Sequence, residues 1–314
     1  MPLDPFLAAK VHLLDGVTWE SAYTNPEHMA RFKEFFADPE GPGMPDVAME
    51  DLSIPGPHGD ISLRVYRPRG AVHRTLVWVH GGGFAAGDLD MPEAHRVSAE
   101  LAVRAGALVV SVGYRLATAE IRYPVPADDV HAAWLWLTQG EGRGLLPSGG
   151  VALGGASAGA ALSLTTAVRL RDQGSQGPEK LLLVYPFVHF PVPALDDETT
   201  AEMLRLPPIL RSSAANVEGM VRNYVGRLTA LPPDAMPGAA GLAGLAPTVV
   251  VVSEYDELRP SGELLVSQLE EVGVPVRRYL APGMPHGHLN RDPSLTEVDR
   301  TLDFLASELA GHRE

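Results

Sequence analysis

The stretch VALGGASAGAALSL, residues 151–164, places Ser157 among glycines and alanines directly behind an apolar run. Residues 155–159 fit the pattern G-x-S-x-G, and a helix-compatible run follows them. In a sharp turn from strand to helix, small neighbours prevent a backbone clash, and the free N–H groups of the helix point at the serine. This context favours a nucleophilic Ser157 over a serine that is only a small turn residue.

A second glycine-rich stretch, His80-Gly81-Gly82-Gly83-Phe84, follows the apolar run 75–79. Consecutive glycines let a backbone approach a ligand closely and aim several N–H groups at one developing negative charge. The alternatives are a phosphate-binding loop and a glycine loop that serves only tight packing. The phosphate alternative lacks support, because neither G-x-G-x-x-G nor the lysine of a P-loop follows.

A serine hydroxyl becomes a good nucleophile only with a base that takes its proton and an acid that orients the base. After a G-x-S-x-G turn between strand and helix, these residues follow along the chain in the order Ser, then Asp or Glu, then His. The late segment APGMPHGHLN offers His286 and His288, and these residues alone leave the choice open. Asp256 is the favoured acid because it lies just past an apolar run, at a turn leading to Arg259-Pro260. Glu254 and Glu257, which flank it, are expected to be solvated charges.

The elements that must position these side chains alternate from about residue 60 onward. Apolar, β-branched runs separated by helical patterns indicate a mostly parallel sheet covered on both faces. Strand-like runs occupy 61–68, 75–80, 107–114, 150–155, 180–186, 247–256 and 274–281, and helices are expected near 92–104, 126–138, 158–172, 260–272 and 294–311.

Two segments, 1–45 and 190–245, interrupt this alternation. The first carries Met29, Phe32 and Phe36 at helical spacing, and the second an apolar stripe from Val217 to Val225. Either the two segments are extra helices that pack on the core, or together they form a lid over the active site.

Composition narrows the class of protein. The chain has 314 residues, of which 45% are hydrophobic, and this length accommodates one large catalytic domain. A net charge of −14 argues against nucleic acid or an anionic membrane as a partner. The absence of cysteine excludes disulfides and thiolate sites. No apolar run approaches the ~20 residues of a membrane span, and the N-terminus lacks a signal-peptide pattern, so a soluble cytoplasmic protein is expected.

With HGGGF, YRLA (114–117), GASAGA, YDELRP and PHGH in this order, residues 55–305 resemble the hormone-sensitive-lipase-like family of α/β-hydrolases, the bacterial family IV esterases. The resemblance implies an α/β-hydrolase fold with a mostly parallel eight-stranded sheet and helices on both faces. It also implies a helical cap, formed by residues 1–45 and by an insertion at about 190–245 in a catalytic domain of residues 46–314.

The same resemblance implies hydrolysis of small carboxylic esters with short-to-medium acyl groups, with no cofactor and no metal. Ser157 would be the nucleophile, His286, rather than His288, the base and then the acid, and Asp256 the orienting carboxylate. The oxyanion hole would consist of the N–H groups of Gly82, Gly83 and Ala158. A homodimer is consistent with this analogy.

The chain also departs from the family pattern, which has Asp in place of both Ala156 and Gly113. Neither position belongs to the triad, so catalysis should survive, but the polar support around the serine must differ. Two alternative functions stay open: an amidase or peptidase with the same triad, and a non-catalytic small-ligand receptor on the same fold.

Overall fold

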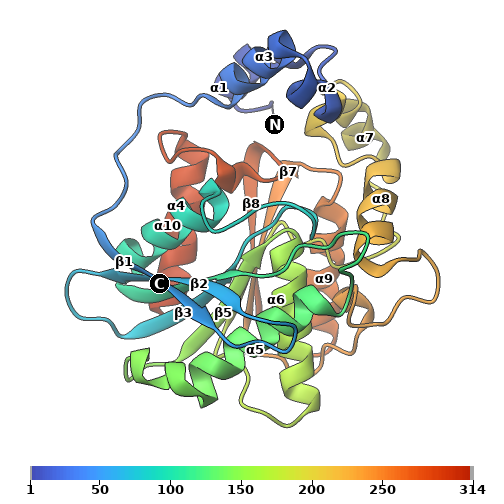
Figure 1. Cartoon of the computed structure of the whole chain (residues 1–314). Coiled ribbons are helices and arrows are strands. Elements are labelled where there is room, and N and C mark those ends of the chain that lie inside the picture. The colour runs from blue at the N-terminus through green and yellow to red at the C-terminus, as the bar shows by residue number, and fades with distance from the viewer. Residues whose placement is uncertain (1, 312–314) are drawn as a thin grey trace.

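The computed structural model describes residues 2–311, and its centre is one sheet of eight strands (Figure 1). The strand order is β1-β2-β4-β3-β5-β6-β7-β8; β2 is antiparallel to β1 and β4, and all other neighbours are parallel. This confirms the expected mostly parallel eight-stranded sheet. The strands are β1 (Val47–Ile54), β2 (Ile61–Pro68), β3 (Arg74–Val79), β4 (Ala107–Gly113), β5 (Val151–Ala156), β6 (Leu181–Val184), β7 (Thr248–Tyr255) and β8 (Val276–Pro285).

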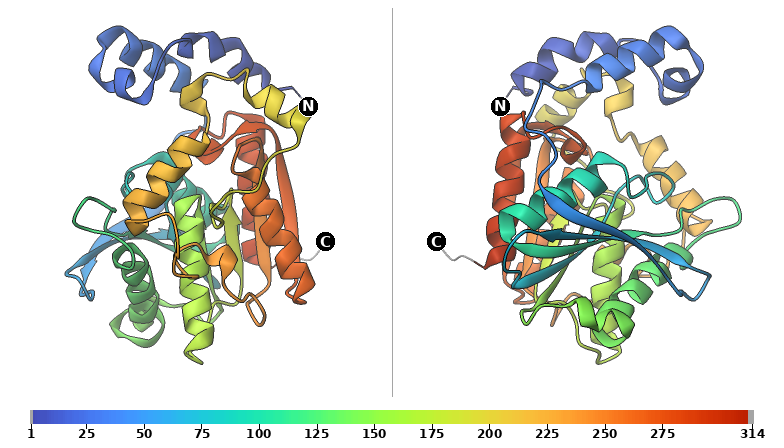
Figure 2. Two further views of the ribbon diagram at one scale, coloured as in Figure 1. Left: turned by 90° about the vertical axis from the view of Figure 1, so that its right-hand side faces the viewer. Right: turned by 60° about the vertical axis from the view of Figure 1, so that its left-hand side comes forward.

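Helices cover both faces of the sheet, as the nearly uninterrupted burial of its central strands requires (Figure 2). One apolar cluster joins the sheet to α5, α6 and α9, and another joins the opposite face to α4 and α10. The helices are α1 (Pro5–Lys10), α2 (Trp19–Thr24), α3 (Pro26–Phe36), α4 (Pro92–Ala105), α5 (Val125–Gln139), α6 (Ala158–Asp172), α7 (Asp197–Met203), α8 (Ala214–Val225), α9 (Arg259–Glu271) and α10 (Thr296–Ala310). Short 3-10 turns are η1 (Val11–Leu14), η2 (Glu141–Leu145), η3 (Pro208–Leu210), η4 (Pro237–Ala239) and η5 (His288–Asn290).

The first strand, β1, was not predicted. Its burial pattern is mostly exposed, and charged residues interrupt its apolar ones, because it is an edge strand that pairs only with β2. An edge strand of this kind shows no continuous apolar run and only a weak alternation. The other seven strands and the five expected helices occur within a few residues of the predicted ranges.

The two interrupting segments are helical and lie near each other. Helices α1 to α3 form a layer at the top of the molecule; α7 lies beside this layer, and α8 lies below α7, at the side of the sheet (Figures 1 and 2). The first segment is attached to the loop after β8, where Arg291 donates to the Phe35 carbonyl oxygen at 2.9 Å and Asp292 N–H to Asp38 at 2.7 Å. That these two segments form a cap over the active site stays a prediction.

Across residues 2–311, no helix is long and apolar enough to span a bilayer.

Candidate active site

Ser157 lies in the turn between β5 and α6, with φ 52° and ψ −117°. A positive φ is costly for a residue with a side chain, and it is kept where the surroundings enforce it. The glycines on either side are required by space. A Cβ at Gly155 would lie 2.5 Å from the Val79 carbonyl oxygen, and one at Gly159 only 2.1 Å from the same atom. Close contact between β3 and the turn therefore explains both glycines of G-x-S-x-G.

The structure brings Ser157, His286 and Asp256 into one hydrogen-bonded chain. His286 Nε2 is 2.9 Å from Ser157 Oγ, and His286 Nδ1 is 2.7 Å from Asp256 Oδ2. Asp256 is 1% exposed, and its other oxygen accepts the Leu258 N–H at 2.8 Å. A carboxylate that accepts from Nδ1–H leaves the Nε2 lone pair facing the serine hydroxyl, which is the tautomer that a base requires.

The electrostatic surroundings of His286 favour its protonated form. Burial opposes the imidazolium, but the Asp256 and Glu93 carboxylates outweigh burial and raise the pKa of His286 above its ordinary value. A raised pKa of this kind suits an imidazole that is to accept a proton from a neighbouring hydroxyl.

His288 has a different place. Its two nitrogens lie 3.0 Å from Ser253 Oγ and 3.2 Å from Thr301 Oγ1, and its side chain is buried. Burial, reinforced by neighbouring His286, lowers the pKa of His288 to about 3. The structure thus places His286, and not His288, against the serine.

The two glutamates beside Asp256 are not solvated charges, contrary to expectation. Glu254 accepts the N–H of Gly283 at 2.7 Å, and Glu257 forms an ion pair with Arg211 at 2.8 Å. Both contacts join distant segments of the chain, so these carboxylates hold the loop around Asp256, a role that local sequence does not reveal.

The loop after β3 has the backbone that glycine allows. Gly82 has φ 99° and Gly83 φ 59°, and a Cβ on Gly82 would lie 2.0 Å from the Ala86 carbonyl oxygen. Within residues 2–311, the N–H groups of Gly82, Gly83 and Ala158 donate no hydrogen bond. Ala158 opens helix α6, whose first N–H groups have no partner within the helix. All three are free to bind an anionic oxygen.

The carbonyl oxygen of Gly81 is held from two sides. The Tyr114 hydroxyl donates to it at 2.9 Å, and His80 Nδ1 lies 2.9 Å from it. His80 is fully buried, and burial lowers its pKa, so it is a neutral donor. Because a peptide unit is planar and trans, fixing this carbonyl also fixes the opposite direction of the Gly82 N–H. Tyr114 and His80 were singled out only as parts of motifs, without this role.

Glu93, on α4, was missed entirely from the sequence. Its side chain is buried at 2% exposure and accepts from the Gly81 N–H at 2.6 Å, from Asn290 Nδ2 at 3.2 Å and from the Tyr185 hydroxyl. Burial raises the pKa of Glu93 in spite of these donors. A glutamate one position into an amphipathic helix gives no sequence signal for such a contact, which depends on the tertiary fold.

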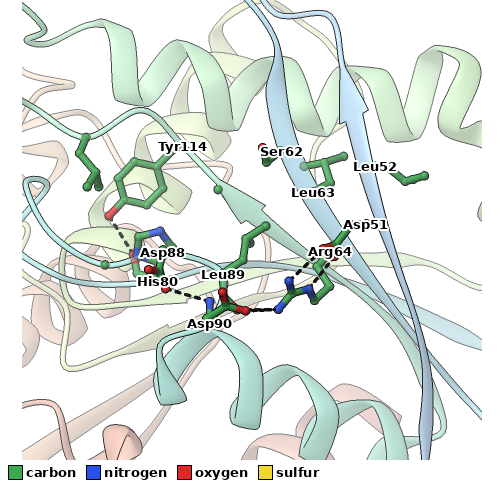
Figure 3. Close-up of a pocket in the computed structure, with 13 residues that line it drawn as sticks. Asp51, Leu52, Ser62, Leu63, Arg64, His80, Asp88, Leu89, Asp90 and Tyr114 are labelled. Atoms are coloured by element: carbon green, nitrogen blue, oxygen red, sulfur yellow. Dashed lines mark hydrogen bonds and ion pairs between the residues drawn. The ribbon is translucent and has the colours of Figure 1, made fainter.

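An open pocket of about 430 Å³ lies beside Gly113, where β4 ends next to His80 and Tyr114 (Figure 3). Arg64 lies on its wall, paired with Asp51 and Asp90. A Cβ at Gly113 would already lie 3.2 Å from the Ser62 carbonyl oxygen and 3.3 Å from the side chain of Leu89. Leu89 and the backbone of β2 therefore take up space that a side chain at this position would need.

A nucleophile turn at the carboxyl edge of this sheet order is the arrangement of an α/β hydrolase. Residues 76–290 match a family model described as the alpha/beta hydrolase fold. The chain belongs to this family, in its hormone-sensitive-lipase-like branch, the bacterial family IV esterases.

Individual relatives are similar in sequence to this chain over most of their length. The chain is 34% identical over 286 residues to esterase LipI of Mycobacterium tuberculosis, covering 87% of this chain and 86% of LipI. It is 28% identical to the ethyl acetate hydrolase of Pseudomonas putida, covering 99% of this chain and all of that protein. Among solved structures, an esterase of Pyrobaculum calidifontis is 32% identical, with a TM-score of 0.82 and 99% of both chains covered.

Proposed function

We propose that this protein hydrolyses carboxylic esters with short-to-medium acyl groups through an acyl-enzyme on Ser157. The observation that carries the proposal is the continuous chain from Asp256 through His286 to Ser157, at distances of 2.7 and 2.9 Å. The names of the relatives, esterases and an ethyl acetate hydrolase, support the same reaction class.

In the first half of the reaction, Ser157 Oγ attacks the ester carbonyl carbon while His286 Nε2 takes its proton. The carbonyl oxygen becomes an oxyanion and accepts from the N–H groups of Gly82, Gly83 and Ala158, each worth about 3 kcal/mol of transition-state stabilisation. His286 then gives its proton to the leaving alcohol. Asp256 stabilises the imidazolium through Nδ1 in the interval.

In the second half, a water molecule replaces the alcohol. His286 takes a proton from the water, whose oxygen attacks the acyl carbon, and Ser157 leaves with the proton that His286 returns. The carboxylic acid is released and the enzyme is regenerated. No step requires a group beyond the side chains and N–H groups named.

We further propose that residues 1–45 and 190–245 form a cap that limits the substrate. Met220, on α8, supports this role, because a Cβ on Gly83 would lie 2.7 Å from its sulfur atom. The thioether therefore lies against the proposed oxyanion loop, where it would restrict the space around a bound acyl group.

The decisive experiment compares Ser157→Ala with Ser163→Ala in the hydrolysis of p-nitrophenyl acetate. Ser163 lies on α6, the helix that follows Ser157; it is buried and donates to the Gly154 carbonyl oxygen at 3.0 Å. We expect S157A to lose all measurable turnover while it keeps its circular dichroism, and S163A to stay active. Turnover by a folded S157A protein would refute the mechanism.

An organophosphonate supplies a second test. Mass spectrometry should find one covalent adduct, on Ser157, in the unmodified protein and none in S157A. A protein that binds esters without turnover and forms no adduct would instead be a receptor on this fold.

A further inference from the structure

Glu93 is a carboxylate enclosed by the groups of the proposed active site. Its Oε1 accepts from Gly81, the residue before the oxyanion glycines, and its Oε2 from Tyr185 and Asn290. Asn290 also donates to the Gly287 carbonyl oxygen at 3.2 Å, in the loop that carries His286. One carboxylate therefore joins the loop after β3 to the loop after β8.

A carboxylate buried in this way is costly unless donors surround it. Three donors reach Glu93, but within residues 2–311 no lysine or arginine forms an ion pair with it. The positive charge that its field favours is that of protonated His286. An apolar side chain could fill the same space but could not accept from Gly81, Tyr185 and Asn290, so these three hydrogen bonds indicate a role in positioning the two loops.

Glu93 also lies directly beside the nucleophile turn. A Cβ built on Gly81 would meet Glu93 Oε1 at 2.6 Å and, at 3.1 Å, both the Ala156 carbonyl oxygen and Ser157 Cβ. Ala156 belongs to the same apolar cluster as Trp78, which donates to the Glu93 carbonyl oxygen at 2.9 Å. Thus Ala156 and Glu93 lie on one face of the sheet.

We propose that Glu93 is a positioning residue of the active site, whose side chain, supplied from α4, fixes the oxyanion loop and joins it to the loop that carries His286. Glu93 holds the N–H of Gly81, while Tyr114 and His80 hold its carbonyl oxygen. With both ends of this residue fixed, the Gly82 N–H is preorganised for the oxyanion. Glu93 thereby places a carboxyl group near Ala156, whose own side chain has no polar atom.

The inference predicts a pH effect, because few titratable groups of residues 2–311 face His286. They are Asp256 after β7, Glu93 on α4, Tyr185 after β6 and His288 in the same loop. Tyr185 and His288 are uncharged near neutral pH, since the pKa of Tyr185 is raised well above its ordinary value and that of His288 is lowered. Among the described residues, Asp256 and Glu93 are therefore the carboxyl groups that raise the pKa of His286.

The test compares Glu93→Gln and Glu93→Asp with Glu297→Gln in the full-length protein. Glu297 is a matched control, since it is 5% exposed and accepts from the Tyr279 hydroxyl, but it does not act on His286. For E93Q we expect kcat to fall about 10- to 100-fold with little change in KM. The acidic limb of its kcat/KM profile should move to lower pH by at least about half a pH unit.

The two other variants separate charge from packing. E93D keeps the charge on a shorter side chain, so its acidic limb should stay near that of the unmodified protein while its kcat is intermediate. E297Q should lose stability to a similar extent as E93Q without any change in kcat or in the limb. If E93Q is folded and keeps the kcat and the limb of the unmodified protein, the inference is wrong.

This inference rests on the proposed function, and the two fail differently. An active Ser157→Ala protein would overturn the proposed mechanism itself. An inactive S157A protein together with an E93Q protein of normal kcat and pH profile would overturn only the role of Glu93.

Discussion

The hydroxyl of Tyr114 donates a hydrogen bond of 2.9 Å to the carbonyl oxygen of Gly81, on the same peptide as the Gly82 N–H. This bond polarises the peptide and fixes its orientation. We expect Tyr114→Phe to lower kcat by about fivefold, the rate equivalent of about 1 kcal/mol, because His80 still holds the carbonyl. KM should change little, since the loss falls on the transition state. Steady-state kinetics on p-nitrophenyl acetate will measure both constants.

Tyr66→Phe is the matched control for that prediction. Tyr66 is fully buried, and its hydroxyl lies 2.9 Å from His95 Nδ1, away from the oxyanion loop. Loss of the Tyr66 hydroxyl should lower stability and leave kcat and KM unchanged. Equal kinetics for Y114F and Y66F would contradict the role of Tyr114.

Activity and stability should depend on pH in opposite ways through His286. Since Asp256 and Glu93 raise its pKa in the folded state, His286 contributes stability below its unfolded pKa and loses that contribution as pH rises through the raised pKa. The base must be neutral, so kcat/KM should rise over the same interval.

Asp256→Asn removes the carboxylate that raises the pKa of His286 most. We therefore expect the acidic limb of D256N at lower pH, with kcat reduced about 10³- to 10⁴-fold. If the acidic limb of D256N lies at the same pH as that of the unmodified protein, the assignment of His286 as the base is wrong.

The sequence predicted the parts of the site whose constraints are local. Ser157 needs small neighbours, and Gly82 needs φ 99° and space that Ala86 denies to a side chain, so both appear as glycine patterns. The buried parallel strands appear as apolar runs, because both of their faces are covered. Edge strand β1 has no such constraint and was missed.

The supporting contacts of the site connect residues far apart in the chain. Glu93 meets Tyr185 across 92 positions, and Tyr114 meets Gly81 across 33. Glu93 has no local pattern that distinguishes it from an ordinary helix residue, and Tyr114 was singled out only as part of the YRLA motif, without this role. For the same reason the pairing of Glu257 with Arg211 could not be read from the chain, and both residues flanking Asp256 were wrongly taken as solvated.

Met220 provides a prediction about acyl length. Its side chain lies against Gly83 from α8, so truncation should open space beside the proposed oxyanion hole. We expect Met220→Ala to raise the ratio of kcat/KM for p-nitrophenyl hexanoate over acetate. Glu218→Ala, an exposed change on the same helix, should leave the ratio unaltered. A ratio that is identical in M220A and the unmodified protein would remove Met220 from the substrate pocket.

Arg291 should control how the N-terminal segment is held. It is 3% exposed, pairs with Asp38 at 2.7 Å and lies over the rings of Phe35 and Phe36. Arg291→Met leaves the Asp38 carboxylate buried without its cation, which typically costs about 3 kcal/mol or more. We expect a lower Tm, faster proteolysis within residues 1–45 and reduced activity.

Two further variants distinguish the buried pair from a general loss of charge. Arg69→Met breaks the exposed pair between Arg69 and Asp46, whose side chains are 82% and 69% exposed, and should change Tm little. In the double variant Asp38→Asn/Arg291→Met no charge is left unpaired, so part of the lost stability should return. If R291M is cleaved no faster within residues 1–45 than R69M, then Arg291 does not secure this segment.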